Sequence, residues 1–344
     1  MSAGAPLTRV RPARRLRLSG LTWLIWRQNR TAFWIGLAAA AALTVYAVIQ
    51  HQSVAAAAGA QHLRACRAHA GSVDCVRDLV AFQHDHQNPI RRPLQAMLLL
   101  PFLFGLFLGG PQIAQELESG TYRTVATQSV TRMRWFMAKL CVPLAMVVVI
   151  SGVMAAAMTW WWHPIVETAG YQQWQYWYPF YGIGPVVVGL SVLLYLVGMT
   201  LGLLLRRTVL AMGATLALGG GLFAMIEWAR PYLPPRHTAT AQHTSTPPVP
   251  DDAWLVADGP LSPTGRHVPE AWDCFTAKDP GPCLSSHGIS GRWADYHPVS
   301  DLWPLQWSTT GICLVLSVVL IAVSAWWVGN GFSSSFRKAS AGRP

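Results

Sequence analysis

The sequence predicts an all-α integral membrane protein, a bundle of six transmembrane helices with a large loop on one side. The first observation is composition: 52% of the residues are hydrophobic and only 12% are charged, whereas soluble domains carry about 25% charged residues. The second is that the apolar residues gather in six blocks, each near the roughly 20 residues that a spanning helix needs. The blocks run over 31–50, 94–111, 139–162, 184–205, 208–228 and 306–329, and none has Asp, Lys or Arg near its middle.

The distribution of charge predicts the orientation of the chain. Residues 1–30 contain arginine at seven positions and no acid. Cytoplasmic flanks of membrane helices are enriched in Lys and Arg, so we expect the N-terminus inside the cell. Six spans return the basic segment 330–344 to the same side, which predicts a multi-pass protein of the plasma membrane with both termini cytoplasmic. The net charge of +11 therefore follows from topology, and we expect membrane lipids rather than nucleic acid as partners.

Two features of the predicted helices remain open at this point. Residues 18–30 could form an amphipathic helix at the inner membrane surface, or they could simply continue the first span. Three spans also carry small residues four positions apart, a spacing that lets helix backbones approach closely. These rows are Gly105 and Gly109, Gly198 and Gly202, and Gly213, Ala217 and Gly221. Chance could produce them, because the spans are rich in glycine.

The two long loops, 51–93 and 229–305, are expected outside the cell. Each holds two cysteines nine positions apart, and the outer compartment is oxidising, so we expect disulfides Cys66–Cys75 and Cys274–Cys283; free thiols are the alternative. Within the second loop, residues 236–252 are rich in Thr and Pro and are expected to be flexible. Residues 254–303 could form a small ordered subdomain. The histidines near residue 85 match no strong ligand spacing, and no metal site is expected.

The most informative segment lies between the second and third spans, at 112–138. Glu116 and Glu118 are expected to end a helix that emerges from the bilayer, and Gly120 can stop that helix because glycine accepts the backbone conformation of a helix C-terminus. Ser129 or Thr131 can then cap a new helix. That helix carries Arg132, Arg134 and Lys139 into the third span.

This segment resembles the intracellular loop of type-2 ATP-binding-cassette (ABC) exporter permeases. Their pattern is roughly Glu-x-Glu-x-Gly-Thr, a short coupling helix, a Ser/Pro-Val-x-Arg turn and a lysine at the membrane. Here it reads Glu116, Glu118, Gly120 and Thr121, then 129–132, then Lys139. The motif covers about thirty residues. Six spans and a large outer loop between the fifth and sixth spans also fit, whereas the cysteine-bearing outer loops depart from the pattern.

The resemblance implies a permease that forms a homodimer or heterodimer and binds cytoplasmic ABC ATPase subunits through a short cytoplasmic coupling helix. The implied contact residues are Glu116, Glu118, Gly120, Thr121, Tyr122, Arg123, Arg132 and Lys139. The chain has no Gly-x-x-x-x-Gly-Lys-Ser/Thr phosphate-binding loop. It is therefore not expected to be an enzyme or to bind a cofactor itself, and ATP and magnesium belong in the partner ATPase.

The cargo implied by the resemblance is exported, and the apolar spans suit a hydrophobic or amphipathic substrate. The alternative function is a membrane-embedded enzyme or a membrane assembly factor that transports nothing. An intramembrane hydrolase would need polar catalytic groups inside the spans. The spans contain no Ser/His/Asp set and no close pair of carboxylates, which favours the permease.

Overall fold

The computed structural model describes residues 21–60, 73–120, 131–169, 174–242, 246–250, 252–275 and 279–331. Within them, six helices are long and apolar enough to cross a membrane, at Trp23–Val54, Arg91–Glu118, Arg132–His163, Gly184–Leu205, Thr208–Tyr232 and Val299–Asn330. The prediction of six spans is confirmed, and the chain is a multi-pass membrane protein.

The second span combines three helical segments: the end of α3 (Val73–Leu103), the π-helix η1 (Phe104–Gly109) and α4 (Gly110–Glu118). The other spans are α1 (Leu21–Ala60), α6 (Arg132–Ala169), α8 (Gly184–Leu205), α9 (Thr208–Ala229) and α11 (Leu302–Trp326), which η5 (Trp327–Gly331) extends; α7 (Trp177–Gly182) precedes α8. α1 is one helix from Leu21 onward. The structure therefore favours the alternative in which the segment before the first span simply continues that span, and not a separate interfacial helix.

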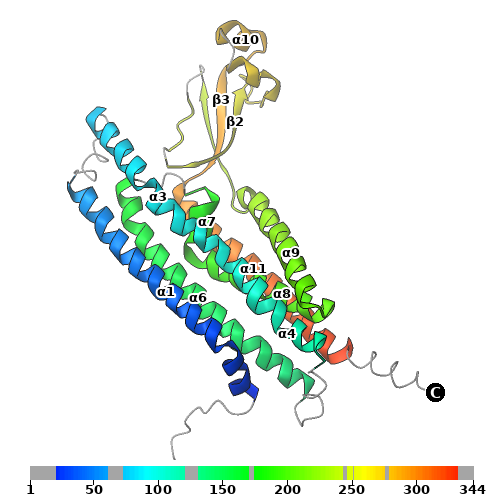
Figure 1. Ribbon diagram of the computed structural model, residues 1–344. Helices are drawn as coiled ribbons and strands as arrows, with labels where there is room; N and C mark the ends of the chain where they lie inside the picture. The colour runs from blue at the N-terminus through cyan, green and yellow to red at the C-terminus, as the bar shows by residue number, and fades with distance from the viewer. Residues whose placement is uncertain are drawn as a thin grey trace, which may run out of the picture.

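Helix α8 forms the centre of the bundle. Its residues are mostly apolar on all sides, and 89% of its most apolar 18-residue stretch is buried. This is expected for a helix that other helices cover all round. α11, α6, α9 and the η1–α4 segment pack around it, and α1 packs on α6 at the side of the bundle, as Figure 1 shows.

Two of the three rows of small residues pack against each other. A Cβ atom added to Gly105 or Gly109 on η1 would lie less than 3 Å from a backbone oxygen of α8. One added to Gly198 or Gly202 on α8 would lie as close to the carbonyl oxygen of Gly105 or Gly110 in the second span. The absence of side chains therefore sets how closely the two backbones approach. The interpretation of these rows as helix contacts is confirmed. The third row is different: added Cβ atoms at Gly213 and Gly221 would have no neighbour within 4 Å among the residues that the structure describes.

A small β-sheet projects from one end of the bundle, called here the sheet end (Figure 1). Strands β1 (His237–Gln242), β2 (Trp254–Leu261) and β3 (Gly291–His297) form an antiparallel sheet in the order β1–β3–β2. The fold class is thus mostly helical with an added sheet. The predicted ordered subdomain is present, but the prediction that 236–252 is flexible is wrong at β1. The alternating Thr238 and Thr240 favour an extended strand once β3 supplies hydrogen-bond partners.

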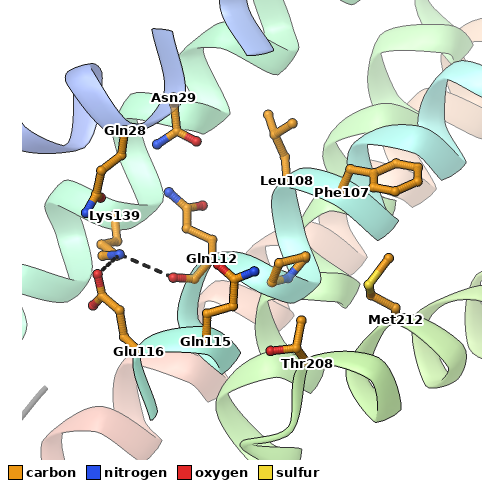
Figure 2. Close-up of a pocket in the computed structure, with 11 residues that line it drawn as sticks. Gln28, Asn29, Phe107, Leu108, Gln112, Gln115, Glu116, Lys139, Thr208 and Met212 are labelled. Atoms are coloured by element: carbon orange, nitrogen blue, oxygen red, sulfur yellow. Dashed lines mark hydrogen bonds and ion pairs between the residues drawn. The ribbon is translucent and has the colours of Figure 1, made fainter. Parts of the chain in front are cut away.

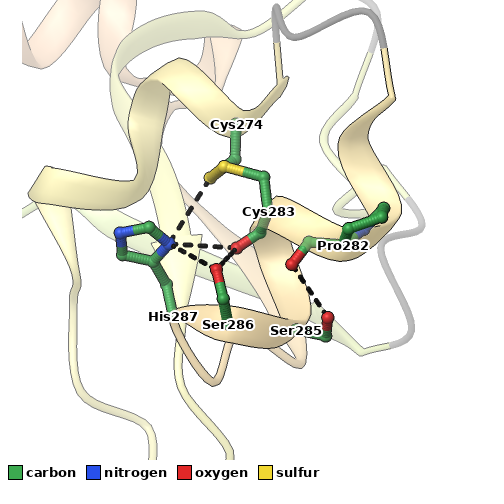
Figure 3. Close-up of a disulfide and its surroundings, with 6 residues drawn as sticks. All are labelled: Cys274, Pro282, Cys283, Ser285, Ser286 and His287. Carbon is green, nitrogen blue, oxygen red and sulfur yellow. Dashed lines mark hydrogen bonds between the residues drawn. A yellow bond between two sulfur atoms is a disulfide. The ribbon is translucent and has the colours of Figure 1, made fainter.

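The tip of the sheet domain is a compact unit of short helices, η3 (Pro269–Phe275) and α10 (Pro280–Ser286). The disulfide Cys274–Cys283 joins them, which confirms one of the two predicted pairs. Figure 3 shows His287 beside this bond, with Nδ1 3.7 Å from Sγ of Cys274 and 3.0 Å from the carbonyl oxygen of Cys283. Cys274 is buried with Ala271, Leu284 and Ile289.

Removing this disulfide is expected to loosen the tip without unfolding the bundle. A bridge that closes a loop of nine residues stabilises its unit by about 2–3 kcal/mol in the chain-entropy model. The variant Cys274→Ser/Cys283→Ser should therefore show faster amide hydrogen exchange over 269–289 and unchanged exchange in α8. Equal exchange at the tip in both proteins would contradict this expectation.

Candidate functional site

The end of the bundle opposite the sheet is formed by the end of α4, the start of α6 and the turn between α8 and α9. We call this region the junction. α4 ends at Glu118, and Gly120 follows with φ +71°, in the left-handed region that favours glycine. Across the loop, the backbone N–H of Arg134 donates to Oγ1 of Thr131 at 3.3 Å, and α6 begins at Arg132. The predicted helix stop at Gly120 and the predicted cap at Thr131 are both confirmed.

A buried ion pair joins the two sides of the junction. Nζ of Lys139 on α6 lies 2.5 Å from Oε1 of Glu116 on α4 and donates to the carbonyl oxygen of Gln112 at 3.2 Å (Figure 2). The Lys139 side chain is only 5% exposed and that of Glu116 is 21% exposed. An ammonium group in so little solvent needs a charged partner, so these two residues fix α4 against α6.

Tyr195 connects this ion pair to the central helix α8. Its hydroxyl group lies 3.3 Å from Oε1 of Gln112 and 3.3 Å from the carbonyl oxygen of Lys139, to either of which it can donate. Tyr195 is fully buried, and burial makes an unsatisfied hydroxyl costly. The ion pair, Gln112 and Tyr195 therefore form a polar cluster from three helices at the junction.

A second contact ties α4 to α9. Oε2 of Glu118 accepts hydrogen bonds from the backbone N–H of Thr208 at 2.9 Å and from its Oγ1 at 2.8 Å. Thr208 is the first residue of α9, so a carboxylate from another helix caps this N-terminus, where negative charge is favourable. Arg206, with φ 56°, forms the tight turn that brings α9 back beside α4.

The structure places the predicted contact residues in two groups. Glu116, Glu118, Gly120 and Lys139 meet at the junction, and Arg132 is exposed at the start of α6. Thr121, Tyr122 and Arg123, together with the predicted coupling helix, lie outside the described residues. The predicted pair Cys66–Cys75 also lies outside them, since Cys66 and the side chain of Cys75 are not described.

Sequence reasoning missed Gln112, Tyr195 and Thr208. A signal existed for the first two: Gln112 lies one helical turn before Glu116, and Tyr195 places a hydroxyl group within a mostly apolar span. Their partners are distant in the sequence, 83 residues apart for Gln112 and Tyr195, and spacing cannot reveal such a contact. Both predicted acids bind other helices, so they hold the base of the loop in place.

This arrangement makes the junction a mechanical unit. The ion pair joins α4 to α6, the Glu118 carboxylate joins α4 to α9, and Tyr195 joins the cluster to α8. A displacement of the loop between α4 and α6 would therefore move several spanning helices together.

A comparison with protein families matches residues 37–230 to the family described as ABC-2 membrane transporter related. Comparisons with curated proteins and with solved structures gave no match. The matched segment covers more than half of the 344 residues and contains α4, α6, α8, α9 and the whole junction, while the sheet lies beyond it. The chain belongs to the ABC-2 membrane transporter related family.

Proposed function

We propose that this protein is the permease subunit of an ABC exporter, driven by a separate ATPase that binds the loop at the junction. In this proposal the junction faces the cytoplasm and the sheet domain faces the outside, as the arginine-rich N-terminal segment favours. Two permease chains, identical or different, pair with ATPase subunits. ATP and magnesium are bound by the ATPase, and this chain contributes no catalytic residue.

The observation that carries the proposal is the ion pair between Glu116 and Lys139, together with the Glu118 cap on α9. A loop that only connected two spans would need no buried charge at its base, since burying a charge is unfavourable without compensation. A loop that transmits force does need a stiff base. Together with Tyr195, these contacts connect α4 to three other helices: α6, α8 and α9.

The proposed mechanism begins with the closure of the ATPase subunits on ATP. Their movement displaces the loop that follows Gly120, and α4 and α6 follow because Glu116 holds Lys139. α9 follows because Glu118 caps it at Thr208. The result is a change between states that open toward opposite sides of the membrane. The cargo is hydrophobic or amphipathic, in keeping with the apolar spans.

Gly120 offers a direct test of the coupling role. No atom of the described residues lies within 4 Å of a Cβ added there, whereas a φ of +71° strains most residues by about 1–2 kcal/mol. We expect Gly120→Val to redirect the loop and to reduce permease-dependent ATP hydrolysis severalfold in liposomes containing both subunits. Gly120→Asn should stay near the native rate, because asparagine tolerates the left-handed conformation.

Three measurements accompany this test: membrane insertion, the elution profile of the purified permease and the amount of bound ATPase. Insertion and elution should be the same for both variants. If Gly120→Val hydrolyses ATP at the native rate, or if both variants lose activity equally, the proposed coupling role is wrong. A membrane assembly factor that transports nothing would show no permease-dependent hydrolysis even in the native protein.

A further inference from the structure

A cavity of about 500 Å³ lies beside the junction, between α1 and α9 (Figure 2). α4 and η1 form its floor, and Lys139 of α6 closes one side. Its volume falls within the range of sites for small molecules, roughly 300–1,000 Å³. All of its lining residues belong to segments that are long and apolar enough to cross a membrane.

Amide side chains are unusually dense in this cavity. Gln28 and Asn29 line it from α1, and Gln112 and Gln115 line it from α4. Polar side chains within membrane helices are unfavourable and tend to mark the path of a substrate or an ion. Nε2 of Gln112 is buried and donates no hydrogen bond to any group in the described residues. A buried donor of this kind suits a ligand that supplies the acceptor.

Along the second and fifth spans, the lining changes from polar to apolar with distance from the junction. Gln115 and Thr208 lie at the junction end, where α4 ends and α9 begins. Phe107 precedes Glu118 by eleven residues, roughly 16 Å along the helix, and with Leu108 and Met212 it forms the deeper wall. A molecule that fills this space needs a polar part near the membrane surface and an apolar part directed toward the bilayer centre.

The charge of the lining further restricts the ligand. Among the described residues that line it, Glu116 and Lys139 are the charged ones, and they pair with each other, so their formal charges sum to zero. The described lining therefore offers an anionic head group no cation beyond Lys139, which Glu116 already neutralises. Neutral amides can both donate and accept hydrogen bonds, which suits head groups that carry no net charge and many polar atoms.

We infer that this cavity is a binding site for an amphiphile whose hydrogen-bonding head group carries no net charge. Its head group contacts the amides of α1 and α4, and its apolar chain lies along Phe107 and Met212. If the amphiphile is exported cargo and the cavity is its loading site, the inference rests on the proposed function. If the amphiphile is a membrane lipid, the inference stands without that function. In either case, displacement of the loop at the junction would change the floor and side of the cavity together, since Glu116 and Lys139 line both.

The test uses the full-length protein without ATPase in nanodiscs of phosphatidylcholine. A trace of phosphatidylethanolamine with a photoactivatable diazirine near its glycerol is added, and mass spectrometry locates the labelled peptides. We expect labelling of the peptide that contains Gln112 and Gln115. The double variant Gln28→Leu/Gln115→Leu should label about tenfold less, the effect of two lost hydrogen bonds. Phosphatidylglycerol with the same diazirine should label the native site weakly, because its head group is anionic.

Gln95→Leu is the matched control, an amide near the sheet end of the second span that is not part of the cavity; it should label as the native protein does. Three results would overturn the inference. The double variant could label as strongly as the native protein, or the anionic probe could label the native site equally. The third is labelling of the cavity no stronger than that of Val315 and Val318, on the exposed face of α11. Because no ATPase is present, such a failure would leave the Gly120 experiment unaffected. Competition by an exported amphiphile distinguishes a cargo site from a structural lipid site.

Discussion

Replacing Glu116 by glutamine is expected to destabilise the bundle by about 3 kcal/mol. Breaking a buried ion pair leaves one charge without compensation, which typically costs about 3–5 kcal/mol. The lower end applies here because the Glu116 side chain is 21% exposed and the Gln112 carbonyl group still accepts from Lys139. Equilibrium unfolding in mixed detergent micelles measures this change. Permease-dependent ATP hydrolysis should fall with it, since α4 is no longer held to α6.

Two variants make this result interpretable. Glu116→Leu/Lys139→Met removes both charges, so it should recover most of the stability, as buried ion pairs replaced by apolar residues often do. It should not recover coupling if the ion pair itself transmits the movement. Asp74→Asn breaks an exposed ion pair, in which the side chain of Arg77 is 73% exposed and that of Asp74 is 82% exposed. It should change stability little. If Glu116→Gln were as stable as Asp74→Asn, the ion pair would not hold the junction.

Replacing Gly198 by alanine is expected to disrupt the contact between α8 and η1. The new methyl group would overlap the carbonyl oxygen of Gly105, less than 3 Å away. A backbone atom cannot rotate aside as a flexible side chain can, so the helices must separate. Overpacking of this kind lowers stability by about 1–3 kcal/mol, and we expect a loss at the upper end of that range. We also expect faster amide hydrogen exchange in α4. Thermal unfolding of the purified protein measures the loss.

Gly213→Ala is the matched control for this substitution. It makes the same chemical change in the neighbouring helix α9, where no atom of the described segments lies within 4 Å of an added Cβ. Alanine is favoured over glycine inside a helix by about 0.5–1 kcal/mol, so stability should stay level or rise slightly. Equal destabilisation by both substitutions would show that the close contact between η1 and α8 is not what requires glycine at position 198.

The sequence predicted the features that depend on local chemistry. The six spans follow from block length, the stop at Gly120 from backbone freedom and the start of α6 from the Thr131 side chain. The disulfide Cys274–Cys283 follows from spacing within one loop. Each of these needs only residues that are close in the chain, so a single sequence suffices.

What the sequence could not predict depends on contacts between distant segments. Glu116 and Lys139 were both expected at the coupling loop, but nothing in a spacing of 23 residues indicates that they bind each other. Strand β1 was mistaken for a flexible segment because its partner, β3, lies more than fifty residues later. The row at Gly213 has the same spacing as that at Gly198, yet only the latter faces another helix of this chain.

The most direct test of the account is to ask what lies against the end of α4 in the native membrane. A photo-crosslinking amino acid is placed at Ser119, which is exposed directly after α4, and in a second variant at Thr264, exposed in the sheet domain. If an ATPase drives this permease through the junction, Ser119 crosslinks to an ATP-binding subunit, more strongly when ATP is present, and Thr264 does not. Crosslinking to that subunit from Thr264, or from neither position, would contradict the claim that an ATPase drives this permease through the junction.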